Sequence, residues 1–400
     1  MSFELKALKD ICTIQIGKTP SRHESDYWRD GTHAWLSIAD MNQGRYLNNT
    51  KEYITDLGVK ASNIKLIPKN TLVLSYKLSI GKVGITQKPM YTNEAIASLT
   101  ELDSQVDINY LYWALQHIDL LENADRAAMG KTLNKAKLSE VKIPLPPLAE
   151  QRRIASILDQ ADELRQKRQQ AIEKLDQLLQ ATFIDMFGDP VDNLKELETV
   201  ALLDLCKKVT DGTHQSPKWT TKGIPFLFIS NIVDGEIDYS SQKFIDQATY
   251  DSLTKSTKIE LNDILYTTVG SYGNVARVKS DQLFCFQRHI AHIKPDFDKI
   301  NPKFLEKMLS SYGVRRQADR LVRGVAQKTL NLKDLKEIIV FNIPLVEQNH
   351  FVQKCEVIES LKIKSKLALN QADDLFKSLQ NQAFNGTSFE NLRYKDSYEI

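Results

Sequence analysis

The sequence contains the same pattern twice, at a fixed offset of 197 residues. Lys-Thr-Leu-Asn begins at Lys131 and again at Lys328, and Pro-Leu-x-Glu-Gln begins at Pro147 and again at Pro344. A fixed-offset repeat of this length indicates two copies of one whole module. Each copy continues into a long helical pattern, so we expect a pseudo-symmetric chain with two equivalent surfaces held apart by a rod. Such an architecture suits a protein that grips something at two places.

Composition agrees with two globular modules. The chain has 400 residues, of which 42% are hydrophobic and 26% charged, enough for two domains with cores of their own. It contains no run of 18 apolar residues and no basic-then-apolar start, so we expect a cytoplasmic protein. Four cysteines lack CxxC spacing. Cys12 and Cys206 occupy matching places in the two copies, which favours small buried thiols over a metal or redox role.

Each module repeats one order of elements: a buried strand, a polar turn, further strands, a glycine-containing loop and an amphipathic helix. The expected strands include residues 34–38, 72–75 and 95–99 in the first copy and 225–229, 264–267 and 289–293 in the second. The glycine-containing loops are residues 79–84 and 271–275. In the first copy the helix carries Leu111, Leu115, Ile118 and Leu121 at helical spacing. We therefore expect an α+β fold with two pseudo-symmetric, mostly β modules and helices at the C-terminal side of each.

Two long helices are the clearest predicted elements. Residues 147–188 and 344–386 have apolar side chains about every 3.5 residues, which is coiled-coil spacing, and each helix should be about 60 Å long. Both seams weaken at matching places, so we expect each helix to be the antiparallel partner of the other. The expected seam residues are Ile154, Leu158, Ala161, Leu164, Ala171, Leu175, Leu178 and Met186, with Phe351, Cys355, Ile358, Leu361, Ala368, Ala372, Leu375, Leu379 and Ala383. The domain boundaries that follow are 1–146, 147–188, 189–343, 344–386 and a tail at 387–400.

Positive charge is concentrated just before each long helix. Residues 126–142 hold five basic residues against one acid, and residues 315–336 hold seven against two, whereas the long helices are nearly neutral. Duplex DNA presents about one negative charge per 1.7 Å and therefore binds clustered Lys and Arg side chains favourably. Solvated helix faces would explain any single lysine equally well, but recurrence in both copies favours nucleic acid.

The sequence contains none of the common catalytic motifs. It has no P-loop, no Gly-rich dinucleotide loop, no HExxH, and no Asn-Pro-Pro-aromatic tetrapeptide of the kind that amino-methyltransferases use on a flipped base. His289 and His292 are three apart on a predicted strand and should face opposite sides, which disfavours a metal pair. Asp296 with Asp334-x-Lys336 imitates a nuclease signature by chance, since the first module has no counterpart. We expect a non-catalytic chain whose partners supply any catalysis.

The segment from Ile143 to Ala155, and the helix end from Phe183 to Gly188, resemble the central conserved region of the specificity subunit of type I restriction-modification systems. The stretches Leu8–Cys12 and Gly17–Arg22 resemble the start of that subunit. The resemblance implies two target-recognition domains, each reading one half of a split DNA sequence, joined by an antiparallel coiled coil. It also implies assembly with two methyltransferase subunits and with nuclease/translocase subunits, with S-adenosylmethionine, ATP and Mg²⁺ on those partners. The second copy departs at residues 341–344 and 349–351, which weakens the case for equal partner contacts.

Sequence reading of DNA needs polar side chains at base edges and Lys or Arg on phosphates. The candidates are loop residues or residues before a long helix: Lys18, Arg22, Lys77, Lys82 and Lys131 in the first module, and Thr213, His214, Lys218, Tyr272, Asn274, Arg323 and Lys328 in the second. Gly17 and Gly212 are expected to shape loops instead of touching DNA. The main alternative is a non-catalytic scaffold that bridges two protein partners, and a self-sufficient nuclease or methyltransferase is disfavoured by the missing motifs.

Overall fold

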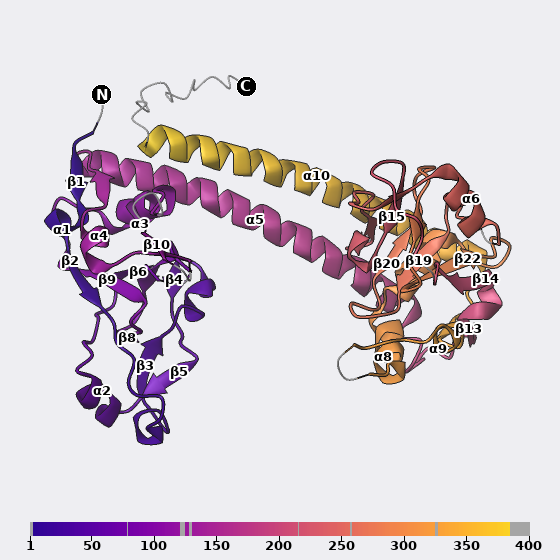
Figure 1. Ribbon diagram of the computed structural model, residues 1–400, viewed down its shortest axis with the longest axis horizontal. Helices are drawn as coiled ribbons and strands as arrows, with labels where there is room; N and C mark the ends of the chain where they lie inside the picture. The colour runs from indigo at the N-terminus through magenta and orange to yellow at the C-terminus, as the bar shows by residue number, and fades with distance from the viewer. Residues whose placement is uncertain are drawn as a thin grey trace. The chain divides into compact units, whose positions relative to one another are not determined.

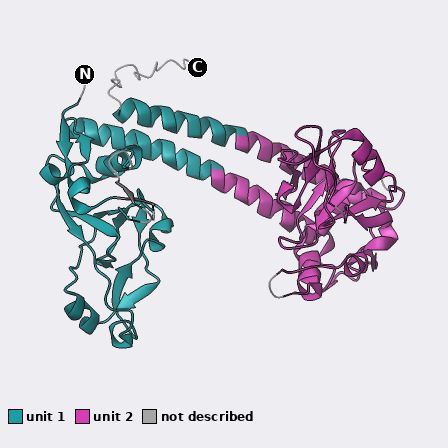
Figure 2. Cartoon of the chain, in the orientation of Figure 1, with its two compact units in different colours: residues 1–168, 367–400 teal, residues 169–366 magenta. Residues whose placement is uncertain are grey.

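The structure, a computed structural model, describes residues 3–77, 79–120, 125–127, 130–214, 216–256, 258–324 and 327–384; for 125–127 and 130–132 only the backbone is described. The chain forms two compact units (Figure 2). Unit 1 comprises residues 1–168 and 367–400, and unit 2 comprises residues 169–366. The division falls within both long helices, so each unit contains a segment of each helix.

Unit 1 is built on a five-stranded sheet with the order β2-β9-β6-β7-β4, antiparallel except for β4 beside β7 (Figure 1). Its strands are β2 (Thr13–Ile16), β9 (Ile96–Thr100), β6 (Leu72–Ser75), β7 (Val83–Thr86) and β4 (Tyr46–Leu47). A three-stranded sheet holds β5 (Glu52–Ile54), β3 (His33–Leu36) and β8 (Tyr91–Thr92), while β1 (Leu5–Ala7) pairs with β12 (Lys142–Pro144) and β10 (Asp125–Ala127) with β11 (Gly130–Thr132). The helices are α1 (Leu8–Ile11), α2 (Asp56–Ser62), α3 (Ile108–His117) and α4 (Lys135–Ser139), with 3₁₀ turns η1 (Ser25–Tyr27) and η2 (Asp40–Gln43).

Unit 2 repeats this plan with a four-stranded antiparallel sheet of order β14-β22-β19-β20. Its strands are β14 (Cys206–Asp211), β22 (Ile290–Pro295), β19 (Ile264–Thr267) and β20 (Val275–Arg277). A second sheet holds β18 (Phe244–Ile245), β15 (Ile224–Leu227) and β21 (Cys285–Phe286), while β13 (Thr199–Ala201) pairs with β23 (Ile339–Phe341) and β16 (Ile232–Val233) with β17 (Glu236–Ile237). The helices are α6 (Gln247–Thr254), α7 (Pro302–Leu309), α8 (Tyr312–Leu321) and α9 (Leu332–Lys336), with 3₁₀ turns η3 (Leu202–Leu205) and η4 (Ile229–Asn231).

The central strand of each main sheet is buried on both faces. In β6, Leu72 and Leu74 join the core shared with α3 and α5, and Val73 joins a smaller core on the other face. In β19, Tyr266 and Leu265 divide between two cores in the same way. Because successive side chains of a strand point to opposite faces, a strand between two cores must be apolar throughout. This explains the continuous apolar runs from which both strands were predicted.

Two forty-residue helices, α5 (Leu148–Phe187) and α10 (Leu345–Phe384), confirm the expected long helices (Figure 1). In unit 1 the start of α5 shares a core with the end of α10, through Ile154 and Ala383 among others. In unit 2 the end of α5 packs on the start of α10, where Phe183 and Phe351 lie edge to face at 5.5 Å. The helices therefore run antiparallel, as expected.

The expected seam is wrong at four positions. Leu164, Leu178, Leu361 and Leu375 are 39%, 48%, 46% and 49% exposed. Buried aromatic residues, Phe183, Phe187 and Phe376, take part in the packing instead. A straight helix has 3.6 residues per turn, so a strict 3.5-residue stripe rotates away from the partner over several turns.

Two smaller expectations also need correction. The helix predicted through Ile118 and Leu121 ends at His117, because Ile118 already has an extended backbone, with φ −70° and ψ 130°; Leu121 lies outside the described residues. Helices are also not confined to the C-terminal side of the modules, since α1, α2 and α6 lie among the strands. As expected for thiols, Cys12 is buried and Cys206 half-buried, both unbonded to another cysteine, and burial raises the pKa of each to about 12.

Candidate nucleic-acid interface

A close backbone crossing shapes the first candidate loop of unit 1. The Gly17 N-H donates to the Ile96 carbonyl at 3.1 Å, and the Lys18 N-H donates to the Thr92 carbonyl at 2.9 Å. A Cβ atom on Gly17 would lie 2.1 Å from the Thr92 oxygen, closer than any side chain tolerates. The crossing therefore requires glycine, and it leaves the Lys18 side chain exposed beside it.

Unit 2 makes the same crossing with different side chains. The Gly212 N-H donates to the Ile290 carbonyl at 3.2 Å, and the Thr213 N-H donates to the Phe286 carbonyl at 3.1 Å. A Cβ atom on Gly212 would lie 2.3 Å from the Phe286 oxygen. Both glycines thus shape loops, as expected, and Thr213 occupies the place that Lys18 occupies in unit 1.

A second loop is also equivalent in the two units. In the turn between β6 and β7, the Ser75 hydroxyl accepts from the Lys82 N-H at 2.9 Å. In the turn between β19 and β20, the Thr267 hydroxyl accepts from the Asn274 N-H at 2.9 Å. The glycine before each of these N-H groups has a positive φ, +95° and +83°. Lys82 and Asn274 are therefore the same structural position with different chemistry.

Arg22 is already engaged within unit 1. Its guanidinium lies 3.8 Å from the centre of the Trp28 ring, and its Nη2 donates to Glu52 Oε2 at 3.0 Å. The hydrogen bond from Arg22 to Glu52 raises the pKa of the arginine. A DNA phosphate would have to compete with Glu52, so Arg22 is placed to support the loop.

The remaining unit 1 candidates differ in availability. Lys82 donates from Nζ to Asn42 Oδ1 at 2.7 Å. Lys77 is half-buried, with its Nζ 5.4 Å from the centre of the Tyr76 ring. Lys131 lies in β11, and its side chain is outside the described part of the chain.

Four unit 2 candidates come together beside the β19–β20 turn. The Gly270 N-H donates to the Lys328 carbonyl at 2.9 Å, and Arg323 forms two backbone hydrogen bonds with Thr329, of 2.9 and 2.8 Å. These contacts bring exposed Arg323 and Lys328 against the turn that carries Tyr272 and Asn274.

Tyr272 is a supporting residue of that turn. It is 6% exposed, and its hydroxyl donates to Asp319 Oδ1 at 2.7 Å. The Arg315 guanidinium lies 4.3 Å from the centre of its ring and donates to its carbonyl at 2.6 Å. The Asp319 hydrogen bond raises the pKa of Tyr272.

The first loop of unit 2 carries Thr213, His214 and Lys218. His214 is exposed and lies 2.9 Å from Asp211 Oδ2 through its Nε2. Lys218 is exposed. Hydrogen bonds from Thr249 lower the pKa of Asp246, and the positive charge of Lys218 adds to this effect. The loop therefore presents an imidazole, from His214, and an ammonium group, from Lys218, to solvent.

Much of the basic charge in residues 315–336 is neutralised within unit 2. Arg315 pairs with Asp319 at 3.0 Å and Arg316 with Asp192 at 2.8 Å. Arg323 has a weaker contact of 3.7 Å with Asp334 and keeps a 75% exposed side chain. A count of charges in the sequence thus exaggerates how much positive charge this surface offers.

Sequence reasoning missed two exposed charged residues in a loop beside these candidates, Glu94 between β8 and β9 and Arg288 between β21 and β22. The sequence contains a signal for them. Residues 93–97 read Asn-Glu-Ala-Ile-Ala, and residues 287–291 read Gln-Arg-His-Ile-Ala. The shared Ile-Ala ending aligns Glu94 with Arg288.

The repeated Glu-Gln places a buried glutamine at the start of each long helix. In unit 1, Gln151 is fully buried, accepts from the Asp107 N-H at 2.9 Å, and donates to the Gln105 and Pro146 carbonyls at 2.8 Å each. Asp107 caps the N-terminus of α3 by accepting from Asn109 and Tyr110. One side chain therefore fixes the start of α3 against the start of α5.

Gln348 makes the same connection in unit 2. It is 1% exposed, accepts from the Asn301 N-H at 2.7 Å, and donates to the Lys299 and Ile343 carbonyls at 3.0 and 2.6 Å. Asn301 is the N-cap of α7. The repeated Glu-Gln motif thus has the same structural role in both units: its glutamine holds the start of a short helix against the start of a long one.

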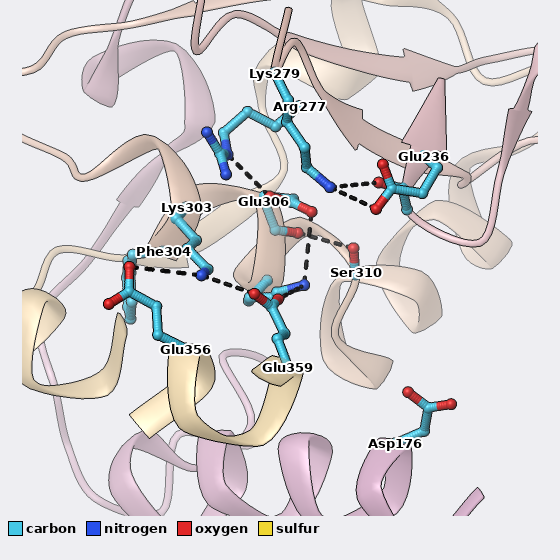
Figure 3. Close-up of polar contacts among 12 residues, drawn as sticks. Asp176, Glu236, Arg277, Lys279, Lys303, Phe304, Glu306, Ser310, Glu356 and Glu359 are labelled. Carbon is cyan, nitrogen blue, oxygen red and sulfur yellow. Dashed lines mark hydrogen bonds and ion pairs between the residues drawn. The ribbon is translucent and has the colours of Figure 1, made fainter. Parts of the chain in front are cut away.

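A chain of buried and half-buried charges joins the four-stranded sheet of unit 2 to α10 (Figure 3). The Arg277 Nε donates to Glu306 at 3.1 Å, and Lys307 lies 3.6 Å from Glu306 and 2.9 Å from Glu359 on α10. Lys303 approaches the same Glu359 at 2.8 Å. Burial alone would raise the pKa of Glu359, but the hydrogen bonds from both lysines outweigh it and hold the pKa below its usual range. Buried ion pairs contribute little net stability, but they define which groups must face each other.

In unit 2, Lys303 also lies 3.7 Å from Glu356, one turn of α10 before Glu359, and unit 1 uses different residues at the place that matches Glu356. Asp159 on α5, 197 residues before Glu356, accepts from Arg45 and from the Trp113 Nε1 at 2.7 Å. Arg45 also donates to Asn109 at 2.8 Å. Both modules are therefore tied to their long helices by carboxylates at related positions.

One histidine of the pair in unit 2, His292, has a structural explanation. His292 is buried and contacts Asp263 at 2.6 Å, and Lys294 reaches the same carboxylate at 2.8 Å. Within the described residues, no cluster of three or more His, Cys, Asp and Glu side chains is arranged to hold a metal ion. Across the same part of the chain, every helix falls short of what a bilayer span needs.

This geometry defines a duplicated binding protein, with one backbone framework in two α+β modules and different exposed side chains on each. Residues 2–174 match the family model described as "Type I restriction modification DNA specificity domain". The chain is similar to the specificity subunits of type I restriction-modification systems, both in this match and in individual relatives.

Individual relatives are similar over most of the chain. The EcoBI specificity subunit of Escherichia coli is 28% identical over 330 residues, covering 75% of this chain and 69% of the relative. The MjaIX specificity subunit of Methanocaldococcus jannaschii is 26% identical over 377 residues, covering 87% and 85%. The solved S subunit from M. genitalium has a TM-score of 0.52 at 16% identity, covering 96% of each chain. A chain from a study of type I R-M complex assembly and conformational transition has a TM-score of 0.62 at 17% identity, covering 96% and 98%. These structures share the fold.

Proposed function

We propose that this chain is the DNA-reading subunit of a type I restriction-modification complex and recognises an asymmetric, bipartite site. Residues 1–146 would read one half and residues 189–343 the other. The pair of long helices would act as the spacer between the half-sites and as the platform for two methyltransferase subunits. Nuclease/translocase subunits would join in the full complex and, with the methyltransferases, carry the chemistry.

The observation that carries this proposal is one backbone framework bearing unlike side chains. Lys18 corresponds to Thr213, and Lys82 corresponds to Asn274, through matching hydrogen bonds. Base edges are distinguished by side-chain donors and acceptors, so equivalent loops with different side chains are expected to read different bases. Two unlike readers on one chain recognise an asymmetric site.

The direct test is to express the chain with its methyltransferase partner in a host that lacks other methylation and to sequence the methylated positions. The proposal predicts one motif with two short specified halves separated by a fixed unspecified gap. A methylated motif without a gap, or no methylation by a complex shown to be assembled, would contradict it.

The spacer role has a separate test. Four residues inserted after Leu175 alone should mainly destabilise the helix pair, because they shift one helix by roughly one turn, about 6 Å. Matched insertions after Leu175 and after Lys362, which lie opposite each other because Lys362 pairs with Asp176, should restore pairing and lengthen the preferred gap by about one or two base pairs, at about 3.4 Å per base pair. An unchanged gap in a folded, active, doubly inserted protein would mean that the partner subunits set the distance.

A further inference from the structure

The loop between β8 and β9 in unit 1 is a tight turn with an exposed acid at its tip. The Asn93 N-H donates to the Leu36 carbonyl at 3.0 Å, and the Ile96 N-H donates back to the Asn93 carbonyl at 3.1 Å. These bonds define the turn, and Glu94 is its second residue, directly after Asn93. Its side chain is exposed, and its Oε2 accepts from the Thr19 hydroxyl.

The loop between β21 and β22 in unit 2 is the same turn with the opposite charge. The Gln287 N-H donates to the Leu227 carbonyl at 3.2 Å, and the Ile290 N-H donates to the Gln287 carbonyl at 3.1 Å. Arg288 therefore corresponds to Glu94. It too is exposed, and its N-H donates to the Thr213 carbonyl at 3.0 Å.

Both turns lie between the two candidate loops of their module. In unit 1 the Glu94 carbonyl accepts from the Tyr76 hydroxyl at 3.0 Å, next to the β6–β7 turn, while the Glu94 side chain contacts Thr19 in the first loop. In unit 2 the Thr268 N-H donates to the His289 carbonyl at 2.9 Å, which places the residue after Arg288 against the β19–β20 turn. The charge difference therefore falls in the middle of the surface assigned to DNA.

The two side chains are expected to bind different bases. A carboxylate repels phosphates, so on a DNA-facing surface its favourable partners are amino groups of bases, above all cytosine N4 in the major groove. An arginine pairs in bidentate fashion with guanine O6 and N7. Among the residues that the structure describes, no carboxylate forms an ion pair with Arg288, in contrast to Arg22 and Arg315.

We propose that Glu94 and Arg288 are specificity-determining residues at one shared reading position: Glu94 selects a cytosine in one half-site and Arg288 selects a guanine in the other. This inference rests on the proposed function. The hydrogen bond from Thr19 orients the Glu94 carboxylate before DNA arrives, which lowers the entropy lost on binding.

The experiment uses the full chain assembled with its methyltransferase partner and sequences methylated sites in a random DNA library. The variants are Glu94→Gln and Arg288→Gln, because glutamine prefers adenine through N6 and N7. Glu94→Gln should shift one cytosine position of the first half-site towards adenine, and Arg288→Gln should shift one guanine position of the second half-site towards adenine. Discrimination at each position should fall by about 5- to 150-fold, with the other half-site unchanged.

The chain supplies its own controls. Each variant is the matched control for the other, since both alter the same turn in different modules. Glu236→Gln, which removes an exposed acid on β17, should leave the whole motif unchanged. Melting temperatures of both test variants should equal that of the wild type, because both side chains are exposed.

Three results would overturn the inference while leaving the proposed function intact: an unchanged motif, a change in the wrong half-site, or uniformly weaker methylation of an unchanged motif. The last result would mean that the residue contacts the backbone of the DNA alone. A wild-type complex that shows no bipartite motif would instead overturn the proposed function.

Discussion

Arg165 on α5 donates from Nε to Oδ1 of Asp373 on α10 at 2.6 Å. The repeat offset of 197 residues relates Arg165 to Lys362 and Asp176 to Asp373. Lys362 on α10 donates to Asp176 on α5, so this second ion pair is the reciprocal of the first. Each long helix therefore contributes one cation and one acid. Only antiparallel pairing of repeated helices produces this reciprocity, since each cation then meets the acid of the other copy.

The two ion pairs should differ in strength. Arg165 also bonds to Asp162 at 3.0 Å and lies 4.5 Å from the centre of the Phe376 ring, whereas among the described residues Lys362 forms an ion pair with Asp176 only. Arg165→Ala should cost about 1–2 kcal/mol of unfolding free energy, and Lys362→Ala at most about 1 kcal/mol.

Urea unfolding of the two variants measures this difference. Lys167→Ala, which removes an exposed pair with Glu163 on the same helix, is the control and should change the free energy by no more than about 0.5 kcal/mol. Equal losses for Arg165→Ala and Lys362→Ala would show that the stacking on Phe376 contributes nothing.

The buried glutamines should be among the most sensitive positions in the long helices. Gln151→Leu would leave the Asp107 N-H and two carbonyls without the partner they now have, and Gln348→Leu would do the same in unit 2. An unsatisfied buried polar group costs about 1–3 kcal/mol, so each variant should lose about 3 kcal/mol. Thermal unfolding checks the loss, with exposed Gln177→Leu as a matched substitution expected to stay within about 0.5 kcal/mol.

Glu359 should make the stability of unit 2 depend on acid pH. Burial opposes its ionisation, yet Lys303 and Lys307 hold its folded pKa below the unfolded value of about 4.3. A depressed carboxylate pKa contributes stability above the unfolded pKa and loses it as the pH falls through the folded pKa. The melting temperature of Glu359→Gln should therefore lie below that of the wild type at pH 7, and the gap should narrow below about pH 4.

Differential scanning calorimetry between pH 7 and pH 3 follows that gap. Glu163→Gln, on an exposed face of α5, should show no such convergence. A gap that stays constant into acid would mean that the lysines stabilise Glu359 by packing alone.

Much of the fold could be predicted because the strongest signals are local. Strands β6 and β19 lie at the predicted residues, since four consecutive apolar or small residues between polar turns favour an extended strand in a buried sheet. The ends of α5 and α10 were predicted within two residues, because proline begins each pattern and glycine ends it.

The remainder depends on contacts between residues that are distant in sequence. Leu164 looks like a seam residue, yet it is exposed and Phe376 is buried in the seam, because a stripe with a strict 3.5-residue spacing rotates away from the partner on a helix with 3.6 residues per turn. Tyr272 looks like a surface aromatic until Asp319 and Arg315 are placed around it. Glu94 and Arg288 belong to no long motif. The Ile-Ala that follows each of them aligns their loops, and matching backbone hydrogen bonds show that the two residues occupy the same turn.

The central claim is that each module reads its half-site independently. Replacing residues 1–142 with those of a relative that recognises a different sequence leaves unit 2 and its charge network unaltered. Sequencing of methylated sites from the complex carrying the exchanged chain should then show one new half-site, while the other half-site and the gap stay as in the wild type. A change in both half-sites, or in neither, would contradict independent reading by the two modules.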